Sequence, residues 1–410
     1  MNIAFLQENP GARTSRMARA LTDAGHTCHL LTRCEPRQFV DAFASIERWS
    51  NPHGYARALL REPFRSADVW HTHLDLRTEW LAPMAALYRG ENGPRIVLDA
   101  RDFDSLSPGQ LIDTVLLEGH SGGQAAHERR AVRNFVTFEE LFSFRVAEGV
   151  IHVGERCQEI SGWIHQPPEQ QAIIYSAVTR GELPPLPDPA ARAGVVYAGG
   201  LDDAGSNGYR DWGRGFGVFG RAWDLHAYPG LTGGGGEFED IALGYRMRGV
   251  TVHDTVPAGD LLTELTRYRW ALVGFDIPFA LGDVAAPNKL FEAVAAGCPC
   301  LVLNCNQAAE LVKAWGIGLV ARDPDHLVAQ MAACPEERWQ QMAARVAVLR
   351  EVMTMEAQVP RLVSLYKKVC NRPLRRSAWL NAEMTVYDWR QDDEICYWPI
   401  TLPTAEEVAA

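Results

Sequence analysis

The sequence predicts a two-domain α/β protein in which each domain is built around a doubly wound parallel sheet. The chain has 410 residues, which is more than one ordinary domain contains. Short apolar segments with the character of strands alternate with amphipathic helical segments, and this alternation is typical of parallel strands joined by crossover helices. A proline-rich segment interrupts the alternation near the middle of the chain, so we expect one sheet on either side of it.

The first half of the chain opens with a clear β-α-β unit. Residues 2–7 form an apolar strand candidate, a helical pattern continues to Asp23, and residues 29–32 form the next strand candidate. The remaining elements expected in this half are strands at 68–71, 95–99, 149–153 and 172–175 and a helix at 80–88.

The domain boundary is expected at the sequence ELPPLPDP, because its prolines cannot continue a helix or a central strand. We therefore expect an N-terminal domain at 1–182, a C-terminal domain at 190–354, and a closing helix with an aromatic-rich tail at 355–410. The elements expected in the C-terminal domain are strands at 194–198, 250–253, 270–275 and 298–303 and helices at 260–266 and 288–296.

The composition limits the class of protein. A formal net charge of −11 argues against a nucleic-acid partner, because phosphate backbones bind basic surfaces. The nine cysteines include no C-x-x-C pair, which favours reduced thiols in a reducing compartment. The sequence has no apolar run of about 18 residues, so no membrane span is expected and a cytoplasmic location is the simplest interpretation. The oligomeric state stays open.

The most informative segment is APNKLFEAVAAGCPCLV, residues 286–302. Pro287 suits the first turn of a helix, on which Asn288, Lys289 and Glu292 share one face. Free N–H groups and the positive end of the helix dipole suit a phosphate, and Glu292 can accept hydrogen bonds from sugar hydroxyls. The alternative is an ordinary amphipathic helix with a solvated Lys289–Glu292 pair.

This segment resembles the element PNKLFEYMAAGLPVI of retaining glycosyltransferases with the GT-B fold, of the family 4 type. The segments at 68–73, 195–200 and 256–261 resemble family segments in the same order, so the resemblance covers about residues 1–368. It implies two Rossmann-like domains facing a central cleft. The acceptor is then expected on the N-terminal domain, and a UDP- or GDP-sugar donor on the C-terminal domain.

The resemblance also implies roles for individual residues. Glu292 would hold the ribose hydroxyls, the turn formed by Pro287, Asn288 and Lys289 would face the diphosphate, and backbone atoms near Val256 would contact the base. It further implies sugar transfer to an acceptor hydroxyl with retention of configuration, with no metal ion and no other bound cofactor.

The donor half departs from the family pattern at two places. Val284 occupies a position where the family commonly has an acidic residue, and its neighbour Asp283 is, with Gly200, a further candidate for donor binding. Gly200 ends a strand without the arginine and lysine that often follow it. The nearest cations, Arg210 and Arg214, are therefore the candidates for binding the diphosphate.

The catalytic residues stay unassigned, with His73, Asp75 and Arg101 as candidates on the acceptor side. His73 ends an expected strand and Asp75 follows it, while Arg101 occupies the place of a histidine that is usual in the family.

Two short motifs formally match metal sites. His71 and His73 form an H-x-H pair, but no third ligand follows with suitable spacing. Asp102 and Asp104 form a D-x-D pair in the half that lacks the donor segment. We therefore expect no metal site.

Two further segments have simple interpretations. Four glycines at 233–236 lack the context of a strand and a helix, and are expected to form a flexible loop. The basic residues between 367 and 376 form a patch that is expected to be solvated, or at most to make peripheral contact with an anionic membrane or a phosphorylated acceptor.

Two other functions stay open beside glycosyl transfer. A sugar-nucleotide epimerase of related fold would share the architecture, and a non-catalytic scaffold on a decayed transferase fold would explain the departures. The acceptor is not identifiable from the sequence: a polysaccharide, a lipid-linked glycan, a small molecule and a modified DNA base are all compatible with it, DNA least because of the net charge.

Overall fold

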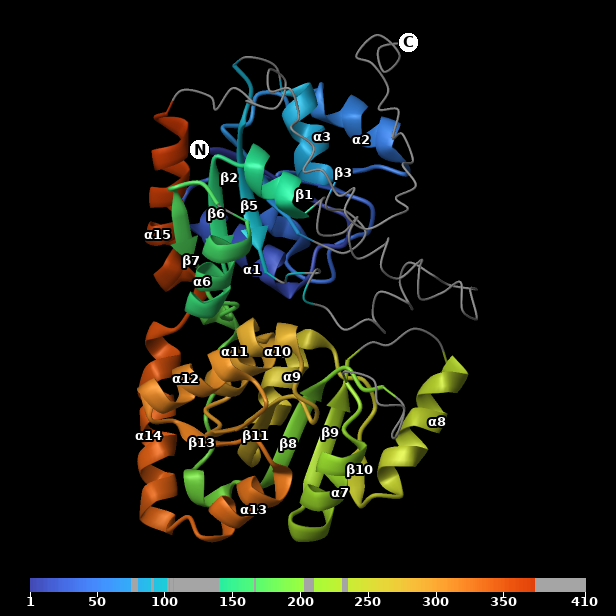
Figure 1. Cartoon of the computed structure of the whole chain (residues 1–410), viewed down its shortest axis with the longest axis vertical. Coiled ribbons are helices and arrows are strands. Elements are labelled where there is room, and N and C mark those ends of the chain that lie inside the picture. Colours follow the sequence, from blue (N-terminus) through green and yellow to red (C-terminus); the bar gives the residue numbers. More distant parts are fainter. Residues whose placement is uncertain are drawn as a thin grey trace, which may run out of the picture.

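The computed structural model describes residues 1–74, 80–89, 92–101, 103, 106, 140–165, 167–202, 210–230 and 235–372. These residues form two α/β domains that follow one another along the long axis of the molecule (Figure 1). Every strand pair in both sheets is parallel. The predicted fold class is therefore confirmed.

The N-terminal domain contains a seven-stranded sheet with the order β3-β2-β1-β4-β5-β6-β7. Its strands are β1 (Asn2–Gln7), β2 (Thr27–Thr32), β3 (Ser45–Arg48), β4 (Val69–His73), β5 (Arg95–Ala100), β6 (Gly149–His152) and β7 (Gln171–Ile173). Its helices are α1 (Ala12–Asp23), α2 (Pro52–Leu59), α3 (Leu81–Tyr88) and α6 (Glu155–Ile164). The central strand β1 is buried from Ile3 onward because helices cover both faces of a doubly wound sheet.

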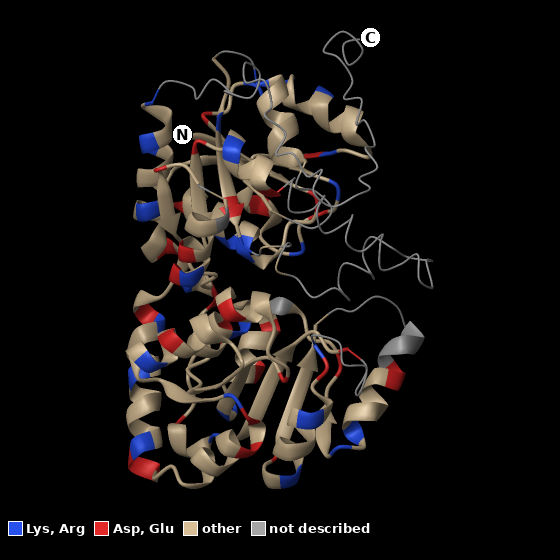
Figure 2. Ribbon diagram, in the orientation of Figure 1, with Lys and Arg blue, Asp and Glu red and all other residues tan. Residues whose placement is uncertain are grey.

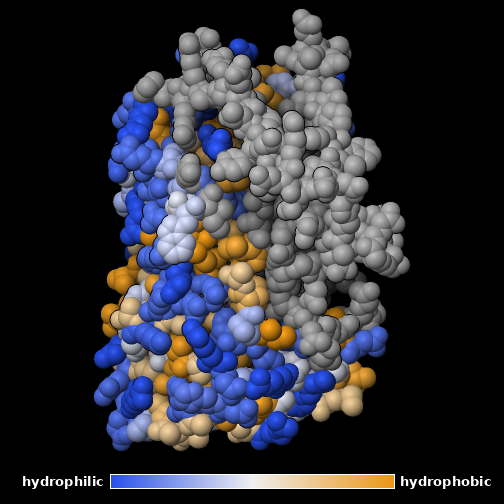
Figure 3. Space-filling model, viewed as in Figure 1, coloured by the Kyte–Doolittle hydropathy of each residue, from blue (hydrophilic) through white to orange (hydrophobic). Residues whose placement is uncertain are grey.

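The C-terminal domain contains a six-stranded sheet with the order β10-β9-β8-β11-β12-β13. Its strands are β8 (Ala193–Gly199), β9 (Leu225–Pro229), β10 (Val250–Val252), β11 (Tyr268–Gly274), β12 (Cys300–Leu303) and β13 (Gly318–Ala321). Its helices are α7 (Gly213–Ala222), α8 (Gly235–Arg246), α9 (Ala258–Leu265), α10 (Ala280–Val284), α11 (Asn288–Ala295), α12 (Asn306–Trp315), α13 (Pro324–Ala332) and α14 (Glu336–Val352). Hydrophilic side chains cover most of the described surface of this domain in Figure 3.

The last described helix, α15 (Met355–Cys370), returns to the N-terminal domain. It follows α14 along one side of the molecule and packs beside β6 and β7 (Figure 1). Met355, Leu362 and Tyr366 join the same apolar cluster as Ile3 and other residues of β1 and β2. The polypeptide therefore crosses between the domains twice. Within the described part of the chain, no helix has the length and apolar character needed to cross a bilayer.

Two of the four glycines at 233–236 are helical, contrary to the sequence-based expectation of a loop without a neighbouring strand and helix. Gly235 and Gly236 are the first residues of α8, the element before it is β9, and Gly233 and Gly234 lie outside the described residues. The short strand β9 was not predicted, so this context was missed.

Candidate functional site

The first strand of the C-terminal domain ends in two glycines at a reversal of strand order. β8 ends at Gly199, with β9 on one side of it and β11 on the other. The carbonyl of Gly199 accepts a hydrogen bond from the N–H of Gly230, which follows β9, at 3.0 Å. Open α/β sheets bind ligands at such a reversal, beyond the carboxyl ends of the strands.

Lys289 reaches this point from α11. Its Nζ donates a hydrogen bond to the hydroxyl of Tyr197 at 3.0 Å and lies 4.3 Å from the centroid of that ring. The Tyr197 hydroxyl in turn donates to the carbonyl of Gly200 at 2.9 Å. A Cβ atom on Gly199 would lie 3.2 Å from Nζ of Lys289, so the glycine permits this close approach.

Arg210 lies against the second glycine. A Cβ atom on Gly200 would lie 2.8 Å from Nη1 and 2.9 Å from Cδ of Arg210. The backbone of Arg210 is held by Asp202, whose Oδ2 accepts from the Arg210 N–H at 3.0 Å. Two cations from distant segments therefore converge on the Gly199–Gly200 backbone.

The start of α11 presents its backbone to the same region. Pro287 is the N-cap residue, with φ of −67°, and no described side chain caps the helix. Asn288 and Lys289, the first two helical residues, are half-buried. Uncapped N–H groups at a helix start favour an anion, through both hydrogen bonding and the helix dipole.

Glu292 lies one turn along α11 and contacts the N-terminal domain. Its Oε1 is 3.5 Å from Nη1 of Arg16 on α1, and its side chain is 16% exposed. Arg16 is also paired with Glu182 at 3.0 Å, in the segment between the two domains.

A buried charged cluster lies at the carboxyl ends of β4 and β5. Arg13 donates from Nε and Nη2 to both carboxylate oxygens of Asp99, at 2.8 and 3.0 Å. His71 and His73 approach Oδ2 of Asp99 to 3.6 and 3.5 Å, and Nε2 of His73 lies 3.3 Å from the hydroxyl of Thr14. All these side chains are buried.

Burial and charge set the protonation of this cluster. Burial lowers the pKa of His73 well below its usual value, although Asp99 opposes the shift, so the ring is neutral. Burial would raise the pKa of Asp99, but the charge of Arg13, which hydrogen-bonds both carboxylate oxygens, outweighs it and holds that pKa well below its usual value. A buried, neutral His73 is suited to a positional role rather than to proton uptake from solvent.

The expectation that no third ligand joins the histidine pair is wrong. His71, His73 and Asp99 offer ligand atoms within 4.8 Å of one another. Asp99 is the register partner of His73 on the neighbouring strand, which spacing along the sequence does not reveal. Because Arg13 occupies both oxygens of Asp99 and carries positive charge, we interpret the group as an ion-pair cluster that supports the sheet.

Two of the other candidates, Arg101 and Val256, lie in described segments. A Cβ atom on Gly11, before α1, would lie 3.8 Å from Nη1 of Arg101, which places Arg101 beside the start of α1. Val256 is half-buried between β10 and α9. Asp75, like Asp102 and Asp104, lies outside the described residues.

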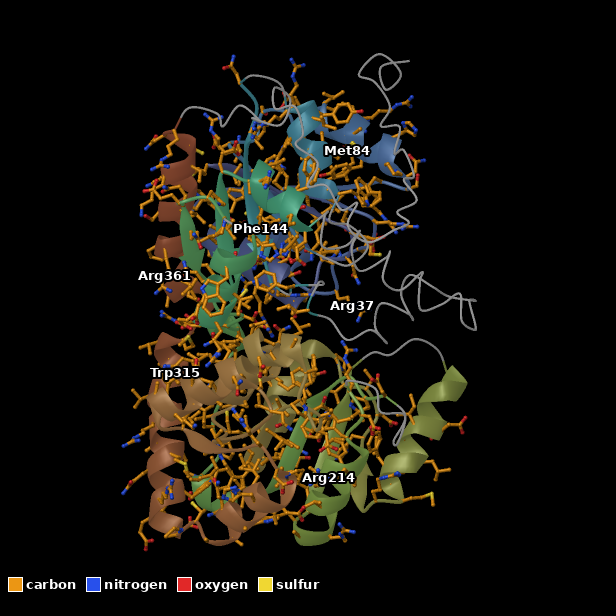
Figure 4. The ribbon with its side chains drawn as sticks, viewed as in Figure 1. Arg37, Met84, Phe144, Arg214, Trp315 and Arg361 are labelled. Carbon is orange, nitrogen blue, oxygen red and sulfur yellow. The ribbon has the colours of Figure 1, made fainter. Side chains whose placement is uncertain are left out.

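Two donor candidates have other partners. Arg214 pairs with Asp323 at 2.5 Å, is 64% exposed, and lies within the C-terminal domain away from the domain junction (Figure 4). The structure does not bring it to Gly200. Asp283 is exposed and accepts from the amide of Asn306 at 2.7 Å. The position eight residues before Glu292 is occupied by Val284, a buried apolar residue, and therefore offers no carboxylate.

The domains also meet along α6 and α12, which the sequence did not indicate. The N–H of Arg156 donates to Gln307 Oε1 at 2.6 Å, and the Gln307 amide donates to Glu155 at 3.0 Å. The ring of Tyr175 lies 5.5 Å from that of Phe291 on α11. These contacts hold α11 and α12 against the N-terminal domain.

Two residues of the basic patch, Lys367 and Lys368, lie on α15, a helix that carries several basic residues in Figure 2. Lys367 and Lys368 are exposed, and Arg372 pairs with Glu169 at 3.0 Å. Arg361 (Figure 4) and Lys368 line a hollow of about 300 Å³ between α6, β7 and α15. Arg375 and Arg376 lie outside the described residues.

Solved structures share this architecture over most of the chain. A glycosyltransferase from Rickettsia africae aligns with a TM-score of 0.61 and 11% identity over 90% of this chain and 99% of that one. Sucrose-phosphate synthase from Thermosynechococcus elongatus aligns with a TM-score of 0.62 and 14% identity, over 90% and 99% of the two chains. HepE from Anabaena, in complex with UDP and glucose, aligns with a TM-score of 0.63 and 14% identity, over 89% and 99%.

These likenesses identify the fold. The chain has the GT-B fold, with two parallel-sheet α/β domains, and its structural neighbours include GT-B glycosyltransferases. No family model matches the chain, and no curated protein matches its sequence.

Proposed function

We propose that the chain transfers a sugar from a nucleotide-sugar donor to an acceptor hydroxyl. The observation that carries the proposal is the convergence of Lys289 and Arg210 on the Gly199–Gly200 backbone, at the uncapped start of α11. Among the described residues no carboxylate pairs with Lys289, whose Nζ donates a hydrogen bond to the Tyr197 hydroxyl. Such a group suits the diphosphate of a nucleotide-sugar.

The proposed donor lies along α11 and the ends of β8 and β10. Lys289, Arg210 and the first N–H groups of α11 bind the diphosphate, Glu292 accepts hydrogen bonds from the ribose hydroxyls, and the backbone near Val256 contacts the base. UDP-sugars are the first candidates, because HepE has been solved with UDP-glucose. GDP-sugars are the second.

The proposed reaction breaks the bond between the anomeric carbon and the diphosphate oxygen, and joins the acceptor oxygen to that carbon on the same face. Negative charge develops on the leaving diphosphate, where Lys289, Arg210 and the helix start stabilise it, so the proposal requires no metal ion. The acceptor proton passes to an oxygen of the leaving phosphate. Glu292 binds the donor and is not the base.

The acceptor is proposed to bind the N-terminal domain, near the start of α1. Arg101 lies beside Gly11 there, and the buried His73 supports the same corner through Thr14. Asp75 remains a candidate by its position after β4.

A thermal-shift panel of UDP, GDP, ADP and their sugars, with EDTA present, tests the proposal. Stabilisation of the wild type by one nucleotide, lost in Glu292→Ala and retained in the exposed control Glu337→Ala, is the expected result. No shift with any nucleotide contradicts it. Consumption of a sugar nucleotide without acceptor and without release of a nucleoside diphosphate would indicate an epimerase instead.

A further inference from the structure

Arg16 is a buried arginine that connects three parts of the chain. It lies on α1 of the N-terminal domain, and its side chain is 2% exposed. Its Nε donates to both carboxylate oxygens of Glu182, at 3.0 Å each, in the segment that links the domains. Its Nη1 lies 3.5 Å from Oε1 of Glu292 on α11 of the C-terminal domain.

Glu182 fixes the orientation of the Arg16 guanidinium. Its Oε2 also accepts from the N–H of Thr179 at 2.7 Å and from the Thr179 hydroxyl at 2.9 Å. The bond from the Thr179 N–H is one half of a capping box at the short turn Arg180–Glu182. Because Glu182 is held by the backbone and Arg16 is held by Glu182, the direction of Nη1 is fixed by the fold.

Nη1 of Arg16 is a buried donor that has no hydrogen-bond partner within the described part of the chain. Buried donors are rarely left unsatisfied, because desolvation is costly, so this atom requires an explanation. The carboxylate of Glu292 contacts Arg16 through Oε1, and no described residue forms a hydrogen bond with its Oε2. Nη1 of Arg16 and Oε2 of Glu292 can therefore each form a further hydrogen bond.

We propose that Arg16 is a positioning residue of the donor site, an inference that rests on the proposed function. The charge of the Arg16 guanidinium draws Oε1 of Glu292 toward Nη1, which directs Oε2 toward the ribose hydroxyls, and Nη1, which has no hydrogen-bond partner among the described residues, is available to a ribose oxygen. The N-terminal domain thereby contributes to donor binding, and a donor that uses Glu292 favours the arrangement in which the two domains are in contact.

A double-mutant cycle on nucleotide affinity tests this role. UDP, or GDP if UDP does not bind, is titrated calorimetrically into the wild type, Arg16→Met, Glu292→Gln and the double variant. Arg16→Met should weaken binding about tenfold in the wild type, as the loss of one charged hydrogen bond implies, and less than about twofold in Glu292→Gln. Arg19→Met is the matched control: it lies on the same helix, pairs with Asp23 and Asp41, and should leave affinity unchanged.

A purely structural Arg16 gives a different result. Arg16→Met would then lower the melting temperature but bind the nucleotide as tightly as the wild type. Alternatively, it would weaken nucleotide binding by the same factor in the wild type and in Glu292→Gln. Either result overturns the inference. Should Arg16→Met not fold, Glu182→Gln replaces it under the same criteria, because it releases the guanidinium and keeps both charges of the Arg16–Glu292 pair. A wild type that binds no nucleotide overturns the proposed function as well, whereas binding without coupling overturns this inference alone.

Discussion

The ammonium group of Lys289 donates to the hydroxyl of Tyr197 and lies over the same aromatic ring, at 4.3 Å from its centroid. A lysine has a long, mobile side chain, and these two contacts restrict it to one place beside Gly199. A cation that is already in position for an anionic ligand loses little conformational entropy when the ligand binds.

Removal of this cation should weaken nucleotide binding strongly. Lys289→Met should raise the dissociation constant of the nucleotide about 10- to 100-fold, because a charged hydrogen bond to phosphate is lost. Tyr197→Phe keeps the ring and should cost about threefold. Calorimetric titration measures both, with the exposed Lys313→Met as the control. Equal nucleotide affinities for Lys289→Met and Lys313→Met would show that Lys289 does not bind the nucleotide.

Gly200→Ala should weaken nucleotide binding without unfolding the protein. The new Cβ atom would lie 2.8 Å from Nη1 and 2.9 Å from Cδ of Arg210, so that side chain must move. We expect an affinity loss of about tenfold, equivalent to one charged contact. Gly259→Ala on α9 is the control, because no atom lies within 4 Å of its Cβ position and helix stability should rise by up to about 1 kcal/mol. A wild-type affinity for Gly200→Ala would contradict the placement of Arg210.

Asp99→Asn should destabilise the N-terminal domain. The change leaves the buried guanidinium of Arg13 without its counter-charge, and breaking a buried pair in this way costs about 3–5 kcal/mol. Glu239→Gln, which removes an exposed pair with Arg246, should cost less than about 1 kcal/mol. Calorimetric melting of the two variants compares them directly, and similar melting temperatures would show that the buried cluster is not a main support of the fold.

The stability of the protein should fall as the pH is lowered below 6.5. Burial, partly opposed by the hydrogen bond to Gln171, lowers the pKa of His152 from 6.5 to about 4. His152 therefore takes up a proton at a higher pH in the unfolded chain than in the folded one. The free energy of unfolding should decrease by about 3 kcal/mol as the pH falls from 7 to 4. Urea denaturation at pH 7 and pH 4 measures the effect. His152→Gln should show a smaller difference between the two pH values, and an identical difference would disprove the assignment.

The helix at 288–296 was predicted well because its signals are local. Pro287 precedes the first turn, and Gly297, with φ of 73°, follows the last. By contrast, β9 gave no strand signal. All of its five residues except the half-buried His226 are buried, so the alternation of apolar and polar side chains that marks a half-buried strand is absent.

The sequence named several residues of the candidate site, Lys289 and Glu292 on one helix and Arg210 near Gly200, but not the contacts between them. Lys289 and Glu292 were found because they share a helix, and their main partners were not. Lys289 is contacted by Tyr197 from strand β8, and Glu292 is contacted by Arg16 from the N-terminal domain. Arg214 was chosen for proximity in sequence to Gly200, yet its partner is Asp323. Contacts of this kind join residues that are far apart in the sequence, so a local sequence pattern does not reveal them.

The return of α15 to the N-terminal domain has a consequence for synthesis on the ribosome. Residues 355–370 complete the apolar cluster that contains Ile3, Leu30 and Ile151. Domains commonly fold in the order in which they emerge, but here the domain that emerges first lacks one of its helices until the second has been made. The C-terminal domain is therefore expected to reach its final packing first, and a nascent chain that stops before residue 355 leaves the earlier domain with an uncovered apolar face.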